Sequence, residues 1–279
     1  MDYKEKYGAW AVVTGASSGI GEAFSNFFAK NGMDIVLISN EDDELKIVSK
    51  RLEQEHKIST ITLCVDLSDP ARYTEITPAI QNLDIGVLAN NVSFGRSGDF
   101  LNFTMDEYSK MIELNAHSYI WLTYMVLPKL IKKNKGALLF TSSMNAMAPN
   151  GGSAVYTATK GFELYFGCAL WDELKNTKID VLNVLPGPTR TRFQERAGTT
   201  TAKIAMSAQE LVEGMVPFLG KEMFYIPGQK NRLLAKSMHC FSFTQKVKLA
   251  SHLHHYLLHE NPKAGFFRIM FEGIKAAFG

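Results

Sequence analysis

The sequence predicts an α/β fold: one doubly wound parallel sheet of about seven strands with helices on both faces. Two observations predict it. Short runs of β-branched and apolar residues alternate with longer stretches whose apolar residues recur at helical spacing. The first short run also ends in a glycine-rich turn, Thr14 to Gly21, that leads directly into an amphipathic stretch. This order of strand, turn and helix is typical of βαβ units.

The predicted strands are nearly continuous apolar runs, as expected of parallel strands that are buried on both faces. They cover residues 9–14, 34–39, 58–65, 85–90, 136–142, 179–186 and 222–227. Helical spacing predicts helices over residues 22–32, where Gly32 ends the helix, 41–56 and 162–176. The apolar stretch 121–131 is too short to cross a bilayer and predicts a buried helix.

Composition and charge argue against several classes of protein and of binding partner. The 279 residues are 46% hydrophobic and carry a formal net charge of +2, so we expect a real core and no nucleic-acid binding by bulk electrostatics. Three cysteines without paired short spacing argue against a disulfide framework and against a zinc site. The charged N-terminus lacks the apolar segment of a secretory signal, and we expect a cytoplasmic protein.

The glycine-rich turn has the spacing G-x-x-x-G-x-G at Gly15, Gly19 and Gly21. Such a turn lets backbone N–H groups approach a pyrophosphate, and the helix N-terminus that follows favours an anion. A glycine triplet alone also fits a tight turn that binds nothing. Asp66 and Asn90, at the ends of the third and fourth predicted strands, lie where open α/β sheets bind ligands. Asp66 fits two compatible roles, acceptor for an adenine amino group and N-cap of the next helix.

The end of the second strand is where an acidic residue binds a ribose 2′-hydroxyl or an arginine binds a 2′-phosphate. This chain has Ser39 and Asn40 there, so neither the acidic residue nor the arginine is present at these two positions. Glu41, Asp42 and Asp43 follow, which repel a phosphate unless they serve as charges at the helix N-terminus. The choice between NAD and NADP stays open at this point.

The second half of the chain carries Ser143, Tyr156 and Lys160 across a strand end, a loop and a helix start. The Tyr-x-x-x-Lys spacing puts both side chains on one helix face, where the ammonium favours phenolate. A phenol titrates near about 10 and must titrate lower to exchange protons at neutral pH. Ser143 can hydrogen-bond a substrate carbonyl, whereas Ser142 is expected to face away.

These motifs together resemble the short-chain dehydrogenase/reductase family, in particular its 3-oxoacyl and carbonyl reductase-like members. The resemblance covers roughly residues 8 to 230 and rests on TGASSGIG, LANN, Asn115 in ELNAHS, Ser143, Tyr-x-x-x-Lys and the run from Pro186 to Thr191. It implies a Rossmann-type domain, residues 1–230, that binds NAD(P)(H) and transfers hydride between nicotinamide and a carbonyl or alcohol.

The resemblance also implies residue roles. Tyr156 would be the general acid/base, Lys160 would bind the nicotinamide ribose and lower the tyrosine pKa, Ser143 would orient the substrate, and Asn115 would support a proton-relay water. The implied cofactor site consists of Gly15, Ser17, Ser18, Gly19, Ile20, Gly21, Ser39, Asn40, Asp66, Leu67, Asn90, Tyr156, Lys160, Pro186, Gly187, Thr189 and Thr191.

Two positions depart from the family pattern. The usual LxNNAG signature reads Leu88-Ala89-Asn90-Asn91-Val92-Ser93 here, so a tight glycine turn is replaced. Asn40 stands where NADP-preferring relatives often have arginine. Ser39 at this position usually accompanies NADP among carbonyl reductase-like members, which favours NADP(H).

Residues 231–279 form a basic, aromatic tail, which we interpret as a helical extension rather than an independent domain. Two interpretations account for the basic and aromatic composition of the tail. It is either a helical cap or subunit interface, or a surface that contacts a membrane or an acidic acyl carrier. The tail contains four histidines without carboxylates or cysteines that could complete a metal site, so no metal is predicted. These histidines are His252, His254, His255 and His259. Relatives are commonly dimers or tetramers, and we expect a homo-oligomer.

Alternative functions on this scaffold are a non-catalytic dinucleotide-binding regulator and an epimerase or isomerase. The intact set of Asn115, Ser143, Tyr156 and Lys160 favours an oxidoreductase. Phe94, Met144, Met147 and residues 190–206 are expected to line the pocket, where the 190–206 segment is a loop or short helices. Their character predicts an apolar carbonyl or alcohol substrate: fatty-acyl, steroid-like or aromatic.

Overall fold

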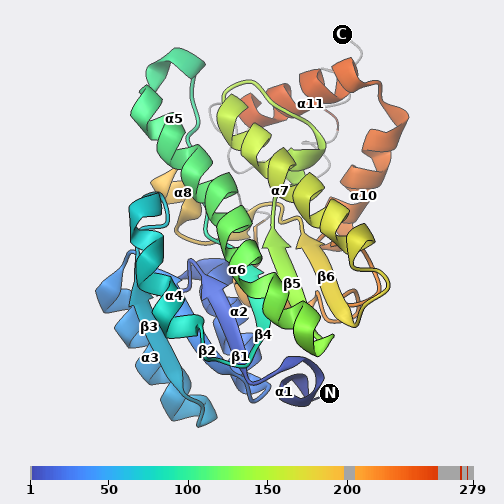
Figure 1. Ribbon diagram of the computed structural model, residues 1–279. Coiled ribbons are helices and arrows are strands. Elements are labelled where there is room, and N and C mark those ends of the chain that lie inside the picture. Colours follow the sequence, from blue (N-terminus) through green and yellow to red (C-terminus); the bar gives the residue numbers. More distant parts are fainter. Residues whose placement is uncertain (1, 198–204, 257–270, 272–274, 276–279) are drawn as a thin grey trace.

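A computed structural model describes residues 2–197, 205–256, 271 and 275. Its core is a seven-stranded parallel sheet in the order β3-β2-β1-β4-β5-β6-β9 (Figure 1). The strands are β1 (Trp10–Thr14), β2 (Asp34–Ser39), β3 (Thr60–Cys64), β4 (Ile85–Asn90), β5 (Gly136–Thr141), β6 (Ile179–Val184) and β9 (Phe224–Tyr225). Each lies inside one of the seven predicted apolar runs, so the predicted sheet is confirmed.

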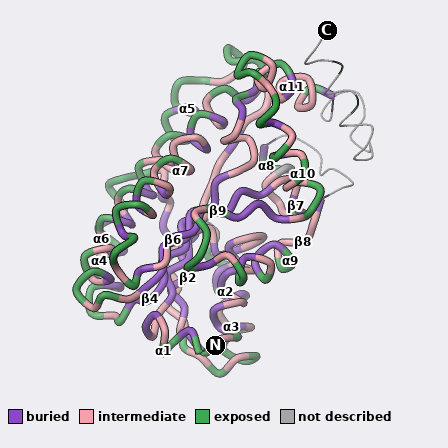
Figure 2. Tube along the Cα trace, turned by 90° about the vertical axis from the view of Figure 1, so that its right-hand side faces the viewer, coloured by how far each residue is buried: buried purple, intermediate pink, exposed green. Residues whose placement is uncertain are grey.

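Helices cover both faces of the sheet, as predicted. One face packs against α1 (Tyr3–Tyr7), α2 (Gly19–Lys30), α3 (Asp42–His56) and α9 (Ala208–Glu213). The other packs against α4 (Ile76–Ile80), α6 (Ser118–Lys133) and α7 (Ala154–Glu173). The sheet has one apolar core on each face, and neighbouring strand residues such as Val12 and Val13 belong to different cores. Figure 2 shows the buried sheet between its helical layers. Burial on both faces explains why the central strands are mostly apolar, whereas the edge strand β3 is partly buried and alternates threonine with apolar residues.

The order of the sheet reverses between β1 and β4, because β2 and β3 lie on one side of β1 while the later strands extend from β4 on the other. Ligands bind beyond the carboxyl ends of the strands at such a switch point. The turn between β1 and α2 lies at that point. The fold therefore places the glycine-rich turn at the expected binding crevice.

The helix over residues 105–133 contains an irregularity that sequence periodicity did not predict. Helix α5 (Met105–Ile112) continues through a π-helical turn (Glu113–His117) into α6. Short 3-10 helices cover Pro70–Glu75, Phe100–Asn102, Met144–Met147 and Met238–Cys240. The stretch 121–131 lies within α6, which confirms the predicted helix. The helix is buried on one face only, because Tyr124 and Ile131 are 76% and 52% exposed.

The segment 190–206 is bounded by two short strands, β7 (Thr189–Arg190) and β8 (Met206–Ser207), which pair with each other in parallel. Helix α8 (Phe193–Arg196) follows β7. Residues 198–204 of this predicted loop lie outside the described residues.

The C-terminal segment is helical where it is described. Helices α10 (Gln229–Ser237) and α11 (Phe243–His255) lie beyond the carboxyl ends of β5 and β6, next to the start of α7 (Figure 1). Met238 and Leu249 pack with Ala148, from the segment after β5, into a small apolar cluster. Within the described ranges, we find no helix long and apolar enough to cross a membrane and no group of three or more metal-ligating side chains. His259, Phe266, Phe267 and Phe278 lie outside these ranges.

Candidate active site

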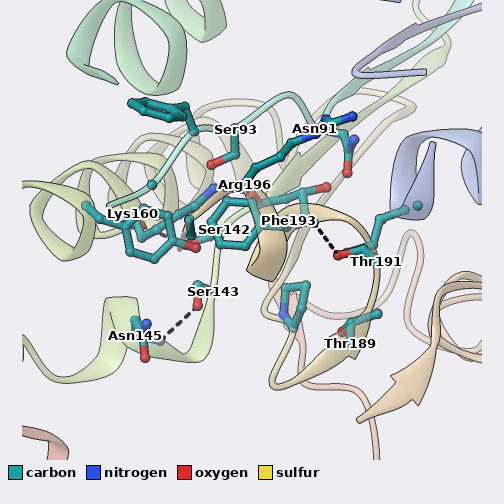
Figure 3. A pocket seen from close by; sticks show the side chains of 18 of the residues that line it. Asn91, Ser93, Ser142, Ser143, Asn145, Lys160, Thr189, Thr191, Phe193 and Arg196 are labelled. Atoms are coloured by element: carbon teal, nitrogen blue, oxygen red, sulfur yellow. Dashed lines mark hydrogen bonds between the residues drawn. The ribbon is translucent and has the colours of Figure 1, made fainter. Parts of the chain in front are cut away.

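A cavity of about 640 Å³ opens at the carboxyl edge of the sheet (Figure 3). It runs from the β1–α2 turn to the start of α7 and to α11. Among its lining residues are fifteen predicted cofactor contacts: Gly15, Ser17, Ser18, Gly19, Ile20, Ser39, Asn40, Asp66, Leu67, Tyr156, Lys160, Pro186, Gly187, Thr189 and Thr191. The fold therefore brings together residues that the sequence spreads over more than half of the chain.

The glycine-rich turn lines the cavity through Gly15, Ser17, Ser18, Gly19 and Ile20. Gly15 and Gly19 have φ of 64° and 61°, in the left-handed region that favours glycine. Gly21 lies behind the turn, where a Cβ would stand 2.1 Å from the Gly15 carbonyl oxygen. Ser18 at the N-cap of α2 makes no side-chain cap hydrogen bond, so the helix N-terminus is available to an anion. These features fit the pyrophosphate of a dinucleotide.

Two predicted residues at the adenosine end take other positions or partners. Asp66 accepts hydrogen bonds from the backbone N–H and the hydroxyl of Ser68, and the N-cap role that we also considered belongs to Asp69. Asn90 is fully buried and donates to Thr123 in α6, so it joins β4 to that helix. Its neighbour Asn91 lines the cavity instead.

An ionic cluster that the sequence did not predict surrounds Glu41. Glu41 follows the end of β2, where folds of this type recognise the 2′ group of the adenosine ribose. The Glu41 carboxylate accepts from the Ser17 hydroxyl at 2.6 Å and from the Arg196 guanidinium at 2.6 Å, with Arg192 at 3.9 Å. Burial raises the pKa of Glu41, but these hydrogen bonds and positive charges outweigh it, so the pKa lies below its usual value. Asp42 and Asp43 lie in the first turn of α3, as the charge-capping interpretation expects.

Tyr156 and Ser143 meet at the other end of the cavity. The Ser143 side chain accepts a hydrogen bond from the Asn145 backbone N–H at 3.1 Å (Figure 3), and Ser143 and Tyr156 both line the cavity. Burial and the charge of Glu163 raise the Tyr156 pKa above its ordinary value, and the nearby Ser143 hydroxyl opposes them. Ser142 donates to the Lys160 backbone carbonyl, in agreement with its predicted orientation away from the substrate.

Lys160 lies on the same face of α7 as Tyr156, as its spacing predicts, with Nζ 5.7 Å from the centre of the Tyr156 ring. Its ammonium donates to the Thr141 carbonyl at 3.1 Å and to both carboxylate oxygens of Glu163 at 2.9 and 3.0 Å. Burial lowers the Lys160 pKa, and the Glu163 carboxylate opposes that shift. Glu163 was missed, although a charge three residues after Lys160 on an otherwise apolar helix was a visible signal.

Asn115 lies in the π-helical turn and is fully buried. Its amide accepts from the Phe94 N–H at 2.9 Å and donates to the Phe94 carbonyl at 2.8 Å and the Thr159 hydroxyl at 3.0 Å. It thus joins the loop after β4 to the start of α7. The predicted relay water stays a prediction.

The remaining wall of the cavity is largely apolar. Phe94 and Met144 line it as predicted. Met147 is not among the lining residues, and it packs together with Met144 against Leu185 and Ile226. The tail contributes wall residues that the sequence did not assign to the pocket: Leu234, Met238, Leu249, Ala250, Leu253 and His254.

Comparisons with known proteins agree with this arrangement. The short chain dehydrogenase family model matches residues 9–202. Very-long-chain 3-oxoacyl-CoA reductase from Rattus norvegicus is 35% identical over 221 residues, which are 77% of this chain and 70% of that protein. The enzyme of the same name from Bos taurus is 38% identical over 185 residues, 64% of this chain but only 59% of that protein.

Solved structures are similar over most of the chain. A short-chain dehydrogenase from Sphingobium yanoikuyae in complex with NADPH is 31% identical, with a TM-score of 0.77 over 83% of this chain and 92% of that one. A 7beta-hydroxysteroid dehydrogenase has a TM-score of 0.80 at 24% identity, over 86% of this chain and 95% of that one, a likeness of fold alone.

Proposed function

Because this chain belongs to the short-chain dehydrogenase/reductase family, we propose that it is an NAD(P)(H)-dependent oxidoreductase acting on a carbonyl or secondary alcohol of an apolar substrate. One observation carries the proposal. The Tyr156 and Ser143 side chains line the same cavity as the glycine-rich turn. A dinucleotide bound along that cavity reaches from the turn to the two hydroxyls.

The chain's own residues supply the proton chemistry. In reduction, Tyr156 gives its proton to the alkoxide that develops on the substrate oxygen, and in oxidation it takes that proton back. Ser143 orients the substrate carbonyl by hydrogen bonding. The nicotinamide, when bound, donates or accepts the hydride. Because burial raises the Tyr156 pKa, oxidation, which needs the phenolate, should become faster as the pH rises.

Tyr156→Phe tests this mechanism. Removing the hydroxyl deletes the general acid/base, so we expect kcat to fall by at least about 100-fold. NADH and NADPH affinities, measured by fluorescence titration, should change little. Tyr165→Phe is the matched control, because Tyr165 is 73% exposed on the same helix, and it should behave as wild type. Undiminished turnover in Tyr156→Phe contradicts the mechanism.

We further propose a 3-oxoacyl thioester as the substrate class. The apolar cavity wall supports it, as do relatives named for very-long-chain 3-oxoacyl-CoA reduction. An assay of 340 nm absorbance loss against 3-oxoacyl-CoA esters of increasing chain length tests the substrate class, with steroid and aromatic ketones as competitors. Dinucleotide binding without turnover of any carbonyl favours the non-catalytic alternative.

For the cofactor we infer NADP(H). The relative solved with NADPH supports this, and so do Arg192 and Arg196, which line the same cavity as Asn40 and contact its sequence neighbour Glu41. A 2′-phosphate would pair with Arg196 in place of Glu41. Arg196→Ala should therefore weaken NADPH binding about tenfold, which corresponds to one charge-assisted hydrogen bond, while NADH binding is spared. Glu41→Gln should strengthen NADPH binding.

Arg190→Ala is the control for this cofactor experiment, because Arg190 donates to the Ala205 carbonyl from the same segment of the chain. Equal losses of NADH and NADPH affinity in Arg196→Ala would show that another group reads the 2′ position. Homo-oligomer formation and a cytoplasmic location remain part of the proposal.

A further inference from the structure

The loop after β4 carries a serine where the usual signature of the family has glycine. Ser93 lies on this loop and lines the cavity (Figure 3). Glycine is required where the backbone takes a positive φ, but among the described non-glycine residues only Lys57 and Asn134 do so. The backbone at position 93 therefore accepts a side chain without strain, and the mechanism proposed above makes no use of its hydroxyl.

Hydrogen bonds hold the residues on both sides of Ser93. The Val92 N–H donates to a hydroxyl at the end of β1 at 3.0 Å, and the Val92 carbonyl accepts from the Tyr119 hydroxyl at 3.0 Å. The Phe94 N–H donates to the Asn115 side chain at 2.9 Å, and the Phe94 carbonyl accepts from the same amide at 2.8 Å. These four bonds fix the backbone that carries Ser93.

The same loop connects the glycine-rich turn with Tyr156. At its start, a Cβ on Gly15 would stand 3.1 Å from the Val92 Cα, and at its end a Cβ on Gly95 would stand 3.0 Å from the Tyr156 ring. In a dinucleotide, the nicotinamide ribose joins the pyrophosphate to the nicotinamide. With the pyrophosphate at the turn and the nicotinamide beside Tyr156, this ribose comes next to Ser93.

Two hydroxyls in this part of the cavity wall have no hydrogen-bond partner among the described residues. The Ser93 hydroxyl is one, and it is shielded from solvent. The other belongs to Thr141 at the end of β5, which also lines the cavity. The Tyr119 hydroxyl lies 3.0 Å from the Val92 carbonyl and 3.4 Å from the Thr141 carbonyl, so the loop and the strand end lie side by side. Buried hydroxyls are normally paired, so both call for a partner from a ligand.

A ribose supplies the partners that these two hydroxyls lack. Rotation about χ1 moves the Ser93 hydroxyl between staggered positions without moving the backbone, so it can turn to a group in the cavity. A hydroxyl both donates and accepts, and a ribose carries two of them on adjacent carbons. An acyl chain offers no such partner. The chemistry of the pair therefore favours the cofactor over the apolar part of the substrate.

We propose that Ser93 and Thr141 bind the two hydroxyls of the nicotinamide ribose, in addition to the contacts predicted for Tyr156 and Lys160. The Lys160 ammonium donates to the Thr141 carbonyl at 3.1 Å, so the residues of this ribose site adjoin one another. The inference rests on the proposed function, in which the cavity binds NAD(P)(H). A ribose held in this way fixes the nicotinamide relative to Tyr156.

The test is calorimetric titration with three ligands: NADPH, 2′-phospho-ADP-ribose, which lacks the nicotinamide, and 2′-phospho-ADP, which lacks the ribose as well. In Ser93→Ala and in Thr141→Val we expect the first two to bind about threefold to tenfold more weakly, as loss of one hydrogen bond predicts. The affinity for 2′-phospho-ADP should be unchanged. NADH, ADP-ribose and ADP are titrated in parallel, so that the result does not depend on which group occupies the 2′ position.

Two other patterns overturn the ribose assignment. A loss for NADPH alone would place the contact on the nicotinamide, and equal losses for all three ligands would show that the hydroxyl supports the loop. Thermal melts separate the second case further. Since neither hydroxyl is paired without ligand, removing it should not lower the melting temperature, whereas a supporting role would lower it.

Ser97→Ala is the matched control. Ser97 lies on the same loop and lines the cavity, but its hydroxyl is 3.4 Å from the Ser153 hydroxyl. It should bind all three ligands as wild type does. Ser93→Gly restores the residue of the usual signature and should lose affinity for the same two ligands as Ser93→Ala.

The wild-type protein separates this inference from the proposed function. If wild type binds neither NADPH nor NADH, the proposed function fails. If wild type binds a dinucleotide and both Ser93→Ala and Thr141→Val bind its whole ligand series with wild-type affinity, the proposed function stands and only the ribose contacts are refuted.

Discussion

Gly21 shows how one hydrogen atom in place of a methyl group shapes the dinucleotide turn. A Cβ there would lie 2.1 Å from the Gly15 carbonyl oxygen and 2.8 Å from the Asn91 amide nitrogen. Backbone would have to move, so Gly21→Ala should destabilise the fold by about 1–3 kcal/mol. We also expect a loss of NADPH affinity of more than about tenfold, because the displaced turn no longer matches a pyrophosphate.

Gly161→Ala is the matched control for Gly21→Ala, because a Cβ at Gly161 has no heavy atom within 4 Å. Alanine favours a helix over glycine by up to about 1 kcal/mol, so this variant should melt at the wild-type temperature or slightly higher. Thermal melts and NADPH titrations of both variants measure the difference. Wild-type NADPH affinity in Gly21→Ala would mean that the turn is not the pyrophosphate site.

Single residues were predictable where their spacing along the chain fixes their geometry. Tyr156 and Lys160 are four residues apart on one helix, so local structure alone brings them to the same face. Glu41 and Arg196 are separated by 155 residues and meet only because the chain returns to β2 after β7. Such a contact leaves no periodic signal in the sequence, which explains why the cluster at the ribose end was missed.

Helices and strands were predictable where their burial leaves a recognisable arrangement of apolar residues in the sequence. Strands buried on both faces give nearly uninterrupted apolar runs, which is why the central strands were predicted. The edge strands β3 and β9 are only partly buried and were predicted from their β-branched and aromatic residues. The two-residue strands β7 and β8 are too short to carry a period, and both were missed. The π-helical turn Glu113–His117 was also missed, because it changes hydrogen bonding while the apolar face continues from α5 into α6. Such turns often lie at functional sites, and this one carries Asn115.

At the scale of the whole molecule, the C-terminal helices α10 and α11 contribute to the cavity wall. The sequence suggested a packed helical cap among other roles, but it could not show which surface the tail covers, because amphipathic spacing identifies an apolar face without its partner. The structure places Leu249 and Leu253 of α11 in the cavity wall. We therefore propose that the tail contributes to substrate binding.

Leu253→Ala tests this role of the tail. Each methylene of an acyl chain buried against a leucine contributes roughly 0.8 kcal/mol, so truncating the side chain should raise KM for long-chain 3-oxoacyl-CoA by about fourfold to tenfold. Short-chain esters, which do not reach α11, should keep their KM, and NADPH affinity should be unchanged because none of the predicted cofactor contacts lies on α11. Leu233→Ala on α10 is the control, since Leu233 is 55% exposed. If KM rises equally for short and long chains, or NADPH affinity falls with it, then Leu253 supports the fold of the tail and does not bind the substrate chain.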